Sequence, residues 1–319
     1  MVVLGAATPR VREPADVRRV LLVVNPGARS AARRAVRAAG ALRARGVACD
    51  VVHTTRAGHA AELAAAVAGS GSHDAVFPLG GDGTAMEALG ALAGSGVPVG
   101  IVPGGTGNLV ARTLGIPLDA ARAVRALLDG ALAEVDLGTV TAAAGEERAA
   151  RHFAFAAGVG IDARMIEATP AHWKRRLGVL AYAVTAARAV VERERFGVRV
   201  TVDGEVVEAE ASAVMIVNFG AVLGDLFHFG PGIAHDDGLL DCCLFAPSSV
   251  ADAARVMWRL ARRDFGEDAS LLYRPGRSFR IETDRPRAAQ ADGELLGHTP
   301  LDVAVVPRAA TLLVPRPPA

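Results

Sequence analysis

The sequence predicts an α/β protein in which a parallel-sheet domain precedes a second, β-rich antiparallel domain. Up to Gly130, apolar strand-like runs alternate with helical segments. After Gly130, short strand-like runs follow one another with few helices between them. The chain has 319 residues, more than a single hydrophobic core usually supports. We therefore expect two domains, residues 1–132 and residues 133–319.

In the first domain, residues 20–24 form a continuous apolar run, typical of a strand covered on both faces. Helices are expected over 31–45, 60–68 and 118–128 and after Thr84, with strands over 47–53, 75–79 and 97–102. Because helices separate the strands, the sheet should be parallel. Ligands of such sheets bind at the carboxyl ends of the strands.

In the second domain, strands are expected over 134–140, 154–159, 197–202, 206–211, 213–218, 239–245, 279–283, 301–306 and 311–314. Helices are expected over 171–194 and 249–262. Asp203 and Gly204 stand between two alternating runs and indicate a hairpin. The sequence leaves open whether the last strands return to the first domain.

Composition excludes several classes of protein. A net charge of +1 and 4% aromatic residues argue against a nucleic-acid-binding surface. The three cysteines show no metal-binding spacing, which favours a reducing compartment. Residues 177–191, the longest apolar helical stretch, contain Arg188 and are too short to span a bilayer. No signal peptide is evident, so we expect a cytoplasmic protein.

The most informative stretch is a glycine-rich turn between the strand at 75–79 and the next helix. It consists of Gly80, Gly81, Asp82, Gly83 and Thr84. Glycines permit a tight turn and leave bare backbone amides at a helix N-terminus, which suits a polyphosphate. The only lysine is Lys174, so a lysine-containing P-loop is excluded. The alternative is an ordinary glycine turn in which Asp82 caps its helix.

Other loops fall at the same predicted sheet edge and combine turn residues with short polar side chains, which suit adenine, ribose or phosphate oxygens. Their candidate residues are Asn25, Pro26, Gly27, Thr54, Gly105, Thr106 and Asn108. Each loop taken singly is equally consistent with a strand-to-helix turn capped by Asn25, Thr54 or Asn108.

Two acidic turns occur in the second domain. Residues 231–241 hold Asp236, Asp237 and Asp241, whose repulsion Mg²⁺ or Ca²⁺ would relieve with help from backbone carbonyls. Asp292 and Glu294 flank a glycine. One carboxylate of such a pair can accept a proton while the other binds a ribose or a cation. A solvated turn and a hairpin turn are the respective alternatives.

This ordered set of motifs resembles the diacylglycerol kinase catalytic-domain family, which includes bacterial lipid kinases and the sphingosine kinases. The resemblance covers residues 20–313. It implies transfer of the ATP γ-phosphoryl group to a lipid hydroxyl with Mg²⁺, in a cleft between the two domains. One departure is in the first loop, where Gly27 is followed by Ala28, Arg29 and Ser30 rather than by a later glycine.

The resemblance also implies residue roles. Residues 80–84 would hold the ATP phosphates, and Asp82 would belong to a water-linked carboxylate network that positions the catalytic Mg²⁺. Asp292 would accept the proton of the lipid hydroxyl. The rest of the nucleotide site would comprise Asn25, Pro26, Gly27, Thr54, Gly105, Thr106, Asn108 and Glu294. A structural Mg²⁺ would be bound by Asp237 and the carbonyls near Ala234 and Leu239.

The lipid acceptor suggests a peripheral contact with a membrane. The helix at 171–194 begins with His172, Trp173 and Lys174 and continues with apolar residues, as an interfacial helix would. It equally suits an amphipathic helix that covers the second sheet. Phe227, His228 and Phe229 are a further candidate for the acceptor wall.

A homodimer is possible. Alternative functions are an NAD kinase, which shares the glycine turn, and a non-catalytic nucleotide-binding regulator.

Overall fold

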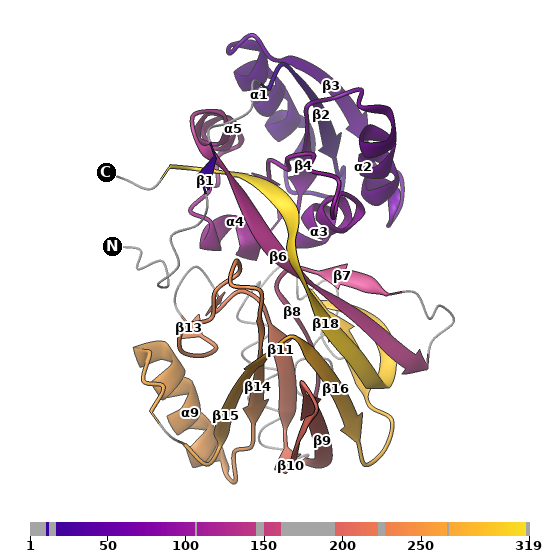
Figure 1. The fold of residues 1–319 in the computed structure, drawn as a ribbon. Coiled ribbons are helices and arrows are strands. Elements are labelled where there is room, and N and C mark those ends of the chain that lie inside the picture. Colours follow the sequence, from indigo (N-terminus) through magenta and orange to yellow (C-terminus); the bar gives the residue numbers. More distant parts are fainter. Residues whose placement is uncertain are drawn as a thin grey trace. The chain divides into compact units, whose positions relative to one another are not determined.

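The computed structural model describes residues 11–12, 17–105, 107–144, 150–160, 195–222, 227–266 and 268–316. The chain divides into two compact units (Figure 1). We call Thr8–Val135 together with Arg308–Ala319 the α/β unit, and the unit that contains Asp136–Pro307 the β unit. The helix expected at 171–194 lies outside the described residues.

The α/β unit is built on a four-stranded parallel sheet in the order β3-β2-β4-β5, as the alternating pattern predicts. Its strands are β2 (Arg19–Val24), β3 (Ala48–His53), β4 (Ala75–Gly80) and β5 (Val102–Pro103). Its helices are α1 (Ala31–Arg43), α2 (His59–Ser70), α3 (Asp82–Ala91), α4 (Leu109–Thr113) and α5 (Ala120–Leu128). All residues of β4 are buried, which explains its unbroken apolar sequence. The short helix α4 was not predicted, because one turn gives no periodicity.

The last strand of the chain completes the α/β sheet. Strand β18 (Glu294–Val314) is continuous, whereas the sequence predicted two strands, at 301–306 and 311–314. Val99 forms parallel bridges to Val76 on one side and to Leu312 on the other. The N–H of Val99 donates to the Thr311 carbonyl and the N–H of Leu313 to the Val99 carbonyl, both at 2.9 Å. The end of β18 therefore belongs to the α/β unit.

The β unit contains a mostly antiparallel sheet in the order β10-β9-β16-β18-β17-β8-β11-β14-β15, with β6 and β7 beside it (Figure 1). The strands not yet introduced are β1 (Val11–Arg12), β6 (Ala131–Ala144), β7 (Arg151–Phe153), β8 (Ala156–Gly160), β9 (Phe196–Val202), β10 (Glu205–Ala211), β11 (Ala213–Val217), β12 (Ala221–Val222), β13 (Phe227–His228), β14 (Leu240–Phe245), β15 (Leu271–Gly276), β16 (Ser278–Thr283) and β17 (Ala288–Ala291). Strands β15 and β17 were not predicted.

The predicted hairpin at Asp203 is present. Val202 pairs with Glu205, and Asp203 and Gly204 have φ values of 48° and 93°, as a type I′ turn requires. The Asp203 carboxylate accepts the N–H of Ser278 at 2.8 Å, so the turn is tied to the start of β16.

Helix α9 (Val250–Arg262) closes one edge of the β unit. Ser249 caps its N-terminus by accepting the N–H of Asp252 at 3.1 Å. Val256 and Leu260 pack with Leu271 and with aromatic residues of the neighbouring segments. The helix expected over 249–262 is thereby confirmed.

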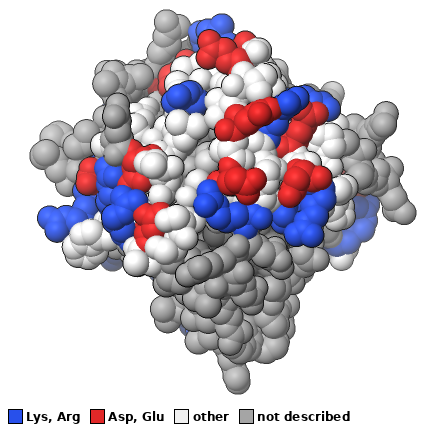
Figure 2. Space-filling model, turned by 90° about the horizontal axis from the view of Figure 1, so that it is seen from below, with Lys and Arg blue, Asp and Glu red and all other residues white. Residues whose placement is uncertain are grey.

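Charges alternate in sign over the face seen in Figure 2. Ion pairs such as Arg199 with Glu208 and Arg280 with Asp302 place opposite charges side by side on the β unit. The described residues of this face therefore present no broad field of one sign. Among the described helices, none is both long and apolar enough to cross a membrane.

Candidate functional site

The glycine turn after β4 lies in backbone contact with the glycine loop after β5. A Cβ on Gly80 would stand 2.5 Å from the Thr84 hydroxyl, and a Cβ on Gly105 would stand 2.6 Å from the Gly81 Cα. The Gly104 N–H donates to the Gly80 carbonyl at 2.7 Å. A side chain at position 80 would displace the Thr84 side chain, and one at position 105 would displace the neighbouring loop, so both positions require glycine.

The first turn of α3 offers amide groups to a ligand. Its N-cap residue, Gly81, has no side chain that could accept a hydrogen bond. Within the described part of the chain, no acceptor is found for the amides of Gly83 and Thr84. Unpaired amides at the positive end of a helix form a ready anion site.

Asp82 does not cap its own helix, contrary to the simpler interpretation of the turn. Its carboxylate faces the N-terminus of α4, where the Val110 N–H donates to Oδ1 at 3.4 Å. A Cβ on Gly107 would stand 3.0 Å from Oδ2, so the loop closes over the carboxylate. Burial raises the pKa of Asp82, and the amides of residues 108–110 oppose that shift. The carboxylate therefore interacts chiefly with the N-terminus of α4.

Two asparagines hold the surrounding loops. Asn25 donates from Nδ2 to the Thr84 hydroxyl at 3.0 Å and accepts the Gly27 N–H at 2.9 Å. Asn108 accepts the Gly105 N–H at 2.9 Å and donates to the Gly105 carbonyl at 2.8 Å. The α/β unit therefore brings the loops that contain Asn25, Gly80 and Gly105 together.

The remaining predicted residues of this unit are less closely connected. Thr54 is buried at the carboxyl end of β3, and its N–H donates to the Val24 carbonyl at 2.9 Å. Pro26 is exposed in the turn between β2 and α1. Thr106 lies outside the described residues.

Sequence reasoning missed Glu87. Its two carboxylate oxygens accept the N–H groups of Gly58 and Ala60, each at 3.0 Å, and so cap α2. A glutamate in a helical pattern gives no sign of such a long-range cap. Helix α3 therefore places its two acids, Asp82 and Glu87, at the N-termini of two other helices.

In the β unit, Asp292 is held by three backbone amides. Its Oδ2 accepts the Ala154 N–H at 2.8 Å, and its Oδ1 accepts those of Phe155 and Ala156 at 2.8 and 2.9 Å. Asp292 and Gly293 have φ values of 47° and 86°, so they form the two-residue hairpin turn between β17 and β18. The hairpin interpretation is correct, and the turn also fixes the orientation of the carboxylate.

Glu294 points to a different partner. Its Oε2 accepts from the Arg151 guanidinium at 2.7 Å, and both side chains are about half exposed, at 51% each. The structure therefore does not bring the Glu294 carboxylate into the amide cradle of Asp292.

The acidic turn at 231–241 gathers several carboxylates. Gly238 donates its N–H to the fully buried Asp136 at 2.7 Å, and Leu239 donates to Asp237 at 2.9 Å. Partial burial and then the negative charges of Asp136 and Asp236 raise the pKa of Asp237. Burial and the charge of Asp237 raise the pKa of Asp241 to about 6. These carboxylates repel one another in the absence of a cation.

Asn218 is a second buried polar residue that the sequence analysis did not select. It follows β11, is fully buried, and donates from Nδ2 to the carbonyls of Asp136 and Ala154 at 2.8 and 2.9 Å. Its Oδ1 has no partner among the described residues. A buried unpaired oxygen costs about 1–3 kcal/mol, so its retention calls for an explanation.

Comparison with known proteins places this geometry in a family. The diacylglycerol kinase catalytic domain matches residues 19–140, and the YegS C-terminal NAD kinase beta sandwich-like domain matches residues 156–314. The chain belongs to the diacylglycerol kinase family.

Individual relatives agree with the assignment. An uncharacterised protein of Synechocystis sp. is 31% identical over 245 residues, which is 75% of this chain but only 54% of that relative. A diacylglycerol kinase of Staphylococcus saprophyticus is 23% identical over 72% of this chain and 73% of its own length. A crystal structure of a "putative diacylglycerol kinase" from Bacillus anthracis has a TM-score of 0.79 at 27% identity and covers 94% of this chain and 98% of its own.

The residues of this lipid-kinase-like chain can be compared with the groups that the family implies. The bare amides of α3 and the glycine contacts fit a phosphate group. For Mg²⁺, the oxygen donors around Asp237 have the right chemistry, and their mutual repulsion would be relieved. The described residues contain no cluster of three or more acidic, histidine or cysteine side chains in metal-binding geometry. A cation there would thus be bound by few side chains, with carbonyls and water completing its shell.

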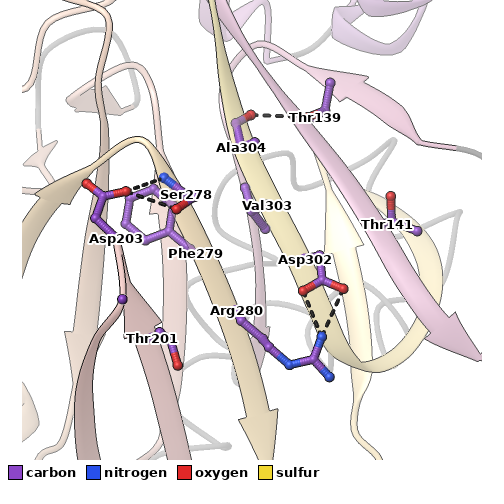
Figure 3. Close-up of a pocket in the computed structure, with 11 residues that line it drawn as sticks. Thr139, Thr141, Thr201, Asp203, Ser278, Phe279, Arg280, Asp302, Val303 and Ala304 are labelled. Carbon is purple, nitrogen blue, oxygen red and sulfur yellow. Dashed lines mark hydrogen bonds and ion pairs between the residues drawn. The ribbon is translucent and has the colours of Figure 1, made fainter.

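A hollow on the β unit is separate from the predicted site. It has a volume of about 400 Å³ and lies between β16, β18 and the β9–β10 turn (Figure 3). Figure 3 shows Arg280 and Asp302 pointing toward each other, at 2.8 and 3.0 Å. No predicted site residue lines the hollow.

Proposed function

We propose that this kinase transfers the γ-phosphoryl group of ATP to the hydroxyl of a lipid alcohol. The proposal rests on two observations: the two glycine loops lie in close backbone contact, and the amides at the start of α3 are unpaired among the described residues. Phosphoryl transfer needs mainly positioning and neutralisation of charge, and backbone amides supply both. Diacylglycerol or a related alcohol such as a sphingoid base is the substrate that the family favours.

The nucleotide would be bound by the α/β unit. The amides of Gly83 and Thr84 would bind phosphate oxygens, and Asn25 would hold the Thr84 hydroxyl in position. Asp82, held against α4, would help to position the catalytic Mg²⁺. Thr54, Thr106 and Glu294 remain predicted members of the nucleotide site.

Mg²⁺, when bound, would neutralise charge on the phosphates and on the acidic turn. Asp237 and the carbonyls of Ala234 and Leu239 would hold the structural ion. Titration of the protein with Mg²⁺, followed by its thermal stability, should show stabilisation in the wild type and a weaker effect in Asp237→Asn. Equal stabilisation of both would exclude Asp237 as a ligand.

Asp292 would accept the proton of the lipid hydroxyl. An aspartate carboxylate is a weak base for an alcohol, so Asp292 would accept the proton late, after the bond to phosphorus has largely formed. Three backbone amides bind this carboxylate. The same donors fix the direction of its carboxylate. A fixed, ionised carboxylate is what a proton acceptor for an alcohol requires.

The chain offers a matched control for Asp292. Asp203 also opens an Asp-Gly hairpin turn, with φ 48° against 47° for Asp292, and its carboxylate also accepts backbone amides. Both Asp292→Asn and Asp203→Asn should lower thermal stability, because an amide cannot accept all the same hydrogen bonds. Only Asp292→Asn should abolish turnover while ATP binding persists. Near-normal turnover in Asp292→Asn would remove this residue from its role.

Contact with a membrane would bring the enzyme to its acceptor. Trp258 on α9 is 63% exposed, and the Arg262 guanidinium lies 5.4 Å from its ring centroid. Exposed tryptophan beside arginine suits the headgroup region of an anionic bilayer. Trp258→Ala should reduce flotation with anionic vesicles, and Leu295→Ala, at a 46% exposed position, should not. Equal flotation of the two variants would argue against this surface.

The decisive experiment is incubation of the purified protein with labelled ATP and a total lipid extract, followed by identification of the labelled product. We expect a phosphorylated lipid. Labelled NADP from a parallel incubation with NAD would instead favour the NAD kinase alternative. ATP binding without any labelled product would favour a non-catalytic regulator.

A further inference from the structure

Two consecutive peptide groups connect Asn218 with Asp292. The Asn218 Nδ2 donates to the Ala154 carbonyl at 2.9 Å, and the N–H of the same peptide group, on Phe155, donates to Asp292 Oδ1 at 2.8 Å. The backbone N–H of Asn218 donates to the Phe155 carbonyl at 3.0 Å, and the N–H of that peptide group, on Ala156, donates to the same Oδ1 at 2.9 Å.

Hydrogen bonds arranged in series strengthen one another. A peptide group whose carbonyl accepts a hydrogen bond becomes a better donor through its N–H, and the effect is larger in a buried environment. Both series run from the donors of Asn218 to the carboxylate of Asp292. The segment 154–156 is therefore fixed on its carbonyl side by Asn218 and on its amide side by Asp292.

The orientation of the Asn218 carboxamide follows from its partners. Both are carbonyl oxygens, of Asp136 and Ala154, so the amino end must face them. The second of these bonds enters the series to Asp292, and the first anchors the side chain to β6. The oxygen end has no partner in the described chain, so the side chain contributes through its donors.

We propose that Asn218 is a positioning residue for Asp292, acting through the peptide groups between Ala154 and Ala156. The proposal rests on the proposed function in one respect: Asp292 is taken as the proton acceptor. Asn218 is fully buried, so it would act on Asp292 only through these peptide groups. It sets the direction of the carboxylate and the strength of the amides that bind it.

Kinetics distinguish positioning from a purely structural role. Asn218→Leu keeps a similar volume but removes both side-chain donors. We expect kcat to fall by about 10–100-fold, as for other residues that orient a catalytic group, with the KM for ATP unchanged. Asn218→Ser retains a hydroxyl donor and should give an intermediate kcat, and it serves as the test if the leucine variant does not fold.

Ser270→Ala is the matched control. Ser270 is also buried in the β unit, at 5% exposure, and donates from its hydroxyl to Asp252 at 2.7 Å. It should lose stability without a change in kcat. A kcat for both Asn218 variants within twofold of that of Ser270→Ala would overturn the proposal.

A measurement independent of activity separates this proposal from the proposed function. In amide NMR spectra, loss of the hydrogen bond to the Ala154 carbonyl should move the Phe155 amide proton upfield in Asn218→Leu, and by a smaller amount in Asn218→Ser, which retains a hydroxyl donor. An unchanged Phe155 resonance would overturn the proposed coupling of Asn218 to Asp292 through the peptide groups, whatever the enzyme phosphorylates. A shifted resonance in a protein without lipid kinase activity would support this coupling and reject the proposed reaction.

Discussion

Asp82 and Asp119 each place a carboxylate at the N-terminus of a helix, yet their surroundings shift their pKa values in opposite directions. Asp119 caps α5 by accepting the Arg122 N–H at 3.0 Å and pairs with Arg37, and these contacts lower its pKa. Asp82 is buried against α4, and burial raises its pKa. The first carboxylate stabilises the fold when ionised, whereas ionisation of the second has a cost.

The direction of each pKa shift predicts how that carboxylate changes the stability of the fold with pH. Below the ordinary pKa of 3.8, the raised pKa of Asp82 favours the folded state, and that contribution is lost as the pH rises through the folded-state pKa. Asp82→Asn should therefore not lower the melting temperature at pH 7, although it should lose Mg²⁺-dependent turnover. Thermal melts at pH 4 and pH 7, with turnover measured against Mg²⁺ concentration, test both statements.

Asp119→Asn is the opposite case. Its lowered pKa stabilises the fold above pH 3.8, and that contribution disappears as the pH falls through the folded-state pKa. The variant should lose about 0.5 kcal/mol at pH 7 through the helix dipole, with unchanged turnover. If Asp82→Asn lost as much stability as Asp119→Asn, the carboxylate of Asp82 would not be the strained group that its burial indicates.

The sequence singled out Asp82, Asp292 and the glycines as candidates because unusual residues cluster there within a few positions. It gave no sign of Glu87, Asp136 or Asn218. Their partners are 27–102 residues away along the chain, and a single polar residue at the end of an apolar run looks like any strand terminus. Local chemistry can be read from neighbouring residues, whereas long-range hydrogen bonds depend on the fold.

At the scale of the elements, the turn at Gly80 and the loop at Gly105 pack directly against each other. The Gly105 backbone contacts Gly81 so closely that a methyl group on Gly105 must displace one of the loops. The turn at Gly80 and the loop at Gly105 are 25 residues apart, so their contact could be expected only from the parallel order of β4 and β5.

Gly105→Ala tests this contact. A Cβ at 2.6 Å from Gly81 forces a backbone shift at the anion site, so ATP should no longer raise the melting temperature. Gly69→Ala is the control, since Gly69 lies in α2 with nothing within 4 Å of its added Cβ. It should stabilise the protein by up to about 1 kcal/mol through helix propensity and retain the ATP effect. An unchanged ATP effect in Gly105→Ala would show that these loops do not bind phosphate.

Periodicity was sufficient for most elements but not for their exact extent. Helices α1, α2, α5 and α9 lie where the apolar spacing predicts them. Strands β15 and β17 were missed because they contain Pro275 and Gln290, which break the expected alternation. Strand β18 was divided in two for a similar reason, at Pro307 and Arg308.

At the scale of the whole chain, β18 is a single strand that pairs with strands of the β unit and, at its end, with the sheet of the α/β unit. Its first part pairs with β16 and β17, and its last part bridges to Val99. Leu312 and Leu313 are 1% and 0% exposed. The sequence could not decide where these last residues pack, since a buried apolar run fits either sheet equally well.

Leu313→Ala should destabilise the α/β unit by about 2–4 kcal/mol, as core truncations do. Leu295→Ala, on the same strand but 46% exposed, should change stability by less than about 0.5 kcal/mol. Hydrogen exchange of the Val99 amide, which donates to Thr311, reports the effect directly. Equal exchange rates in the two variants would mean that the last strand does not support the sheet.

The position of Thr311 and Leu313 beside Val99 also bears on biosynthesis. A ribosome releases residues 19–128, with helices α1 to α5, long before it releases the strand that borders Val99. During that interval the nascent unit exposes an open sheet edge. Completion of this unit must therefore wait until residues 308–314 have been made, although most of the unit is made first.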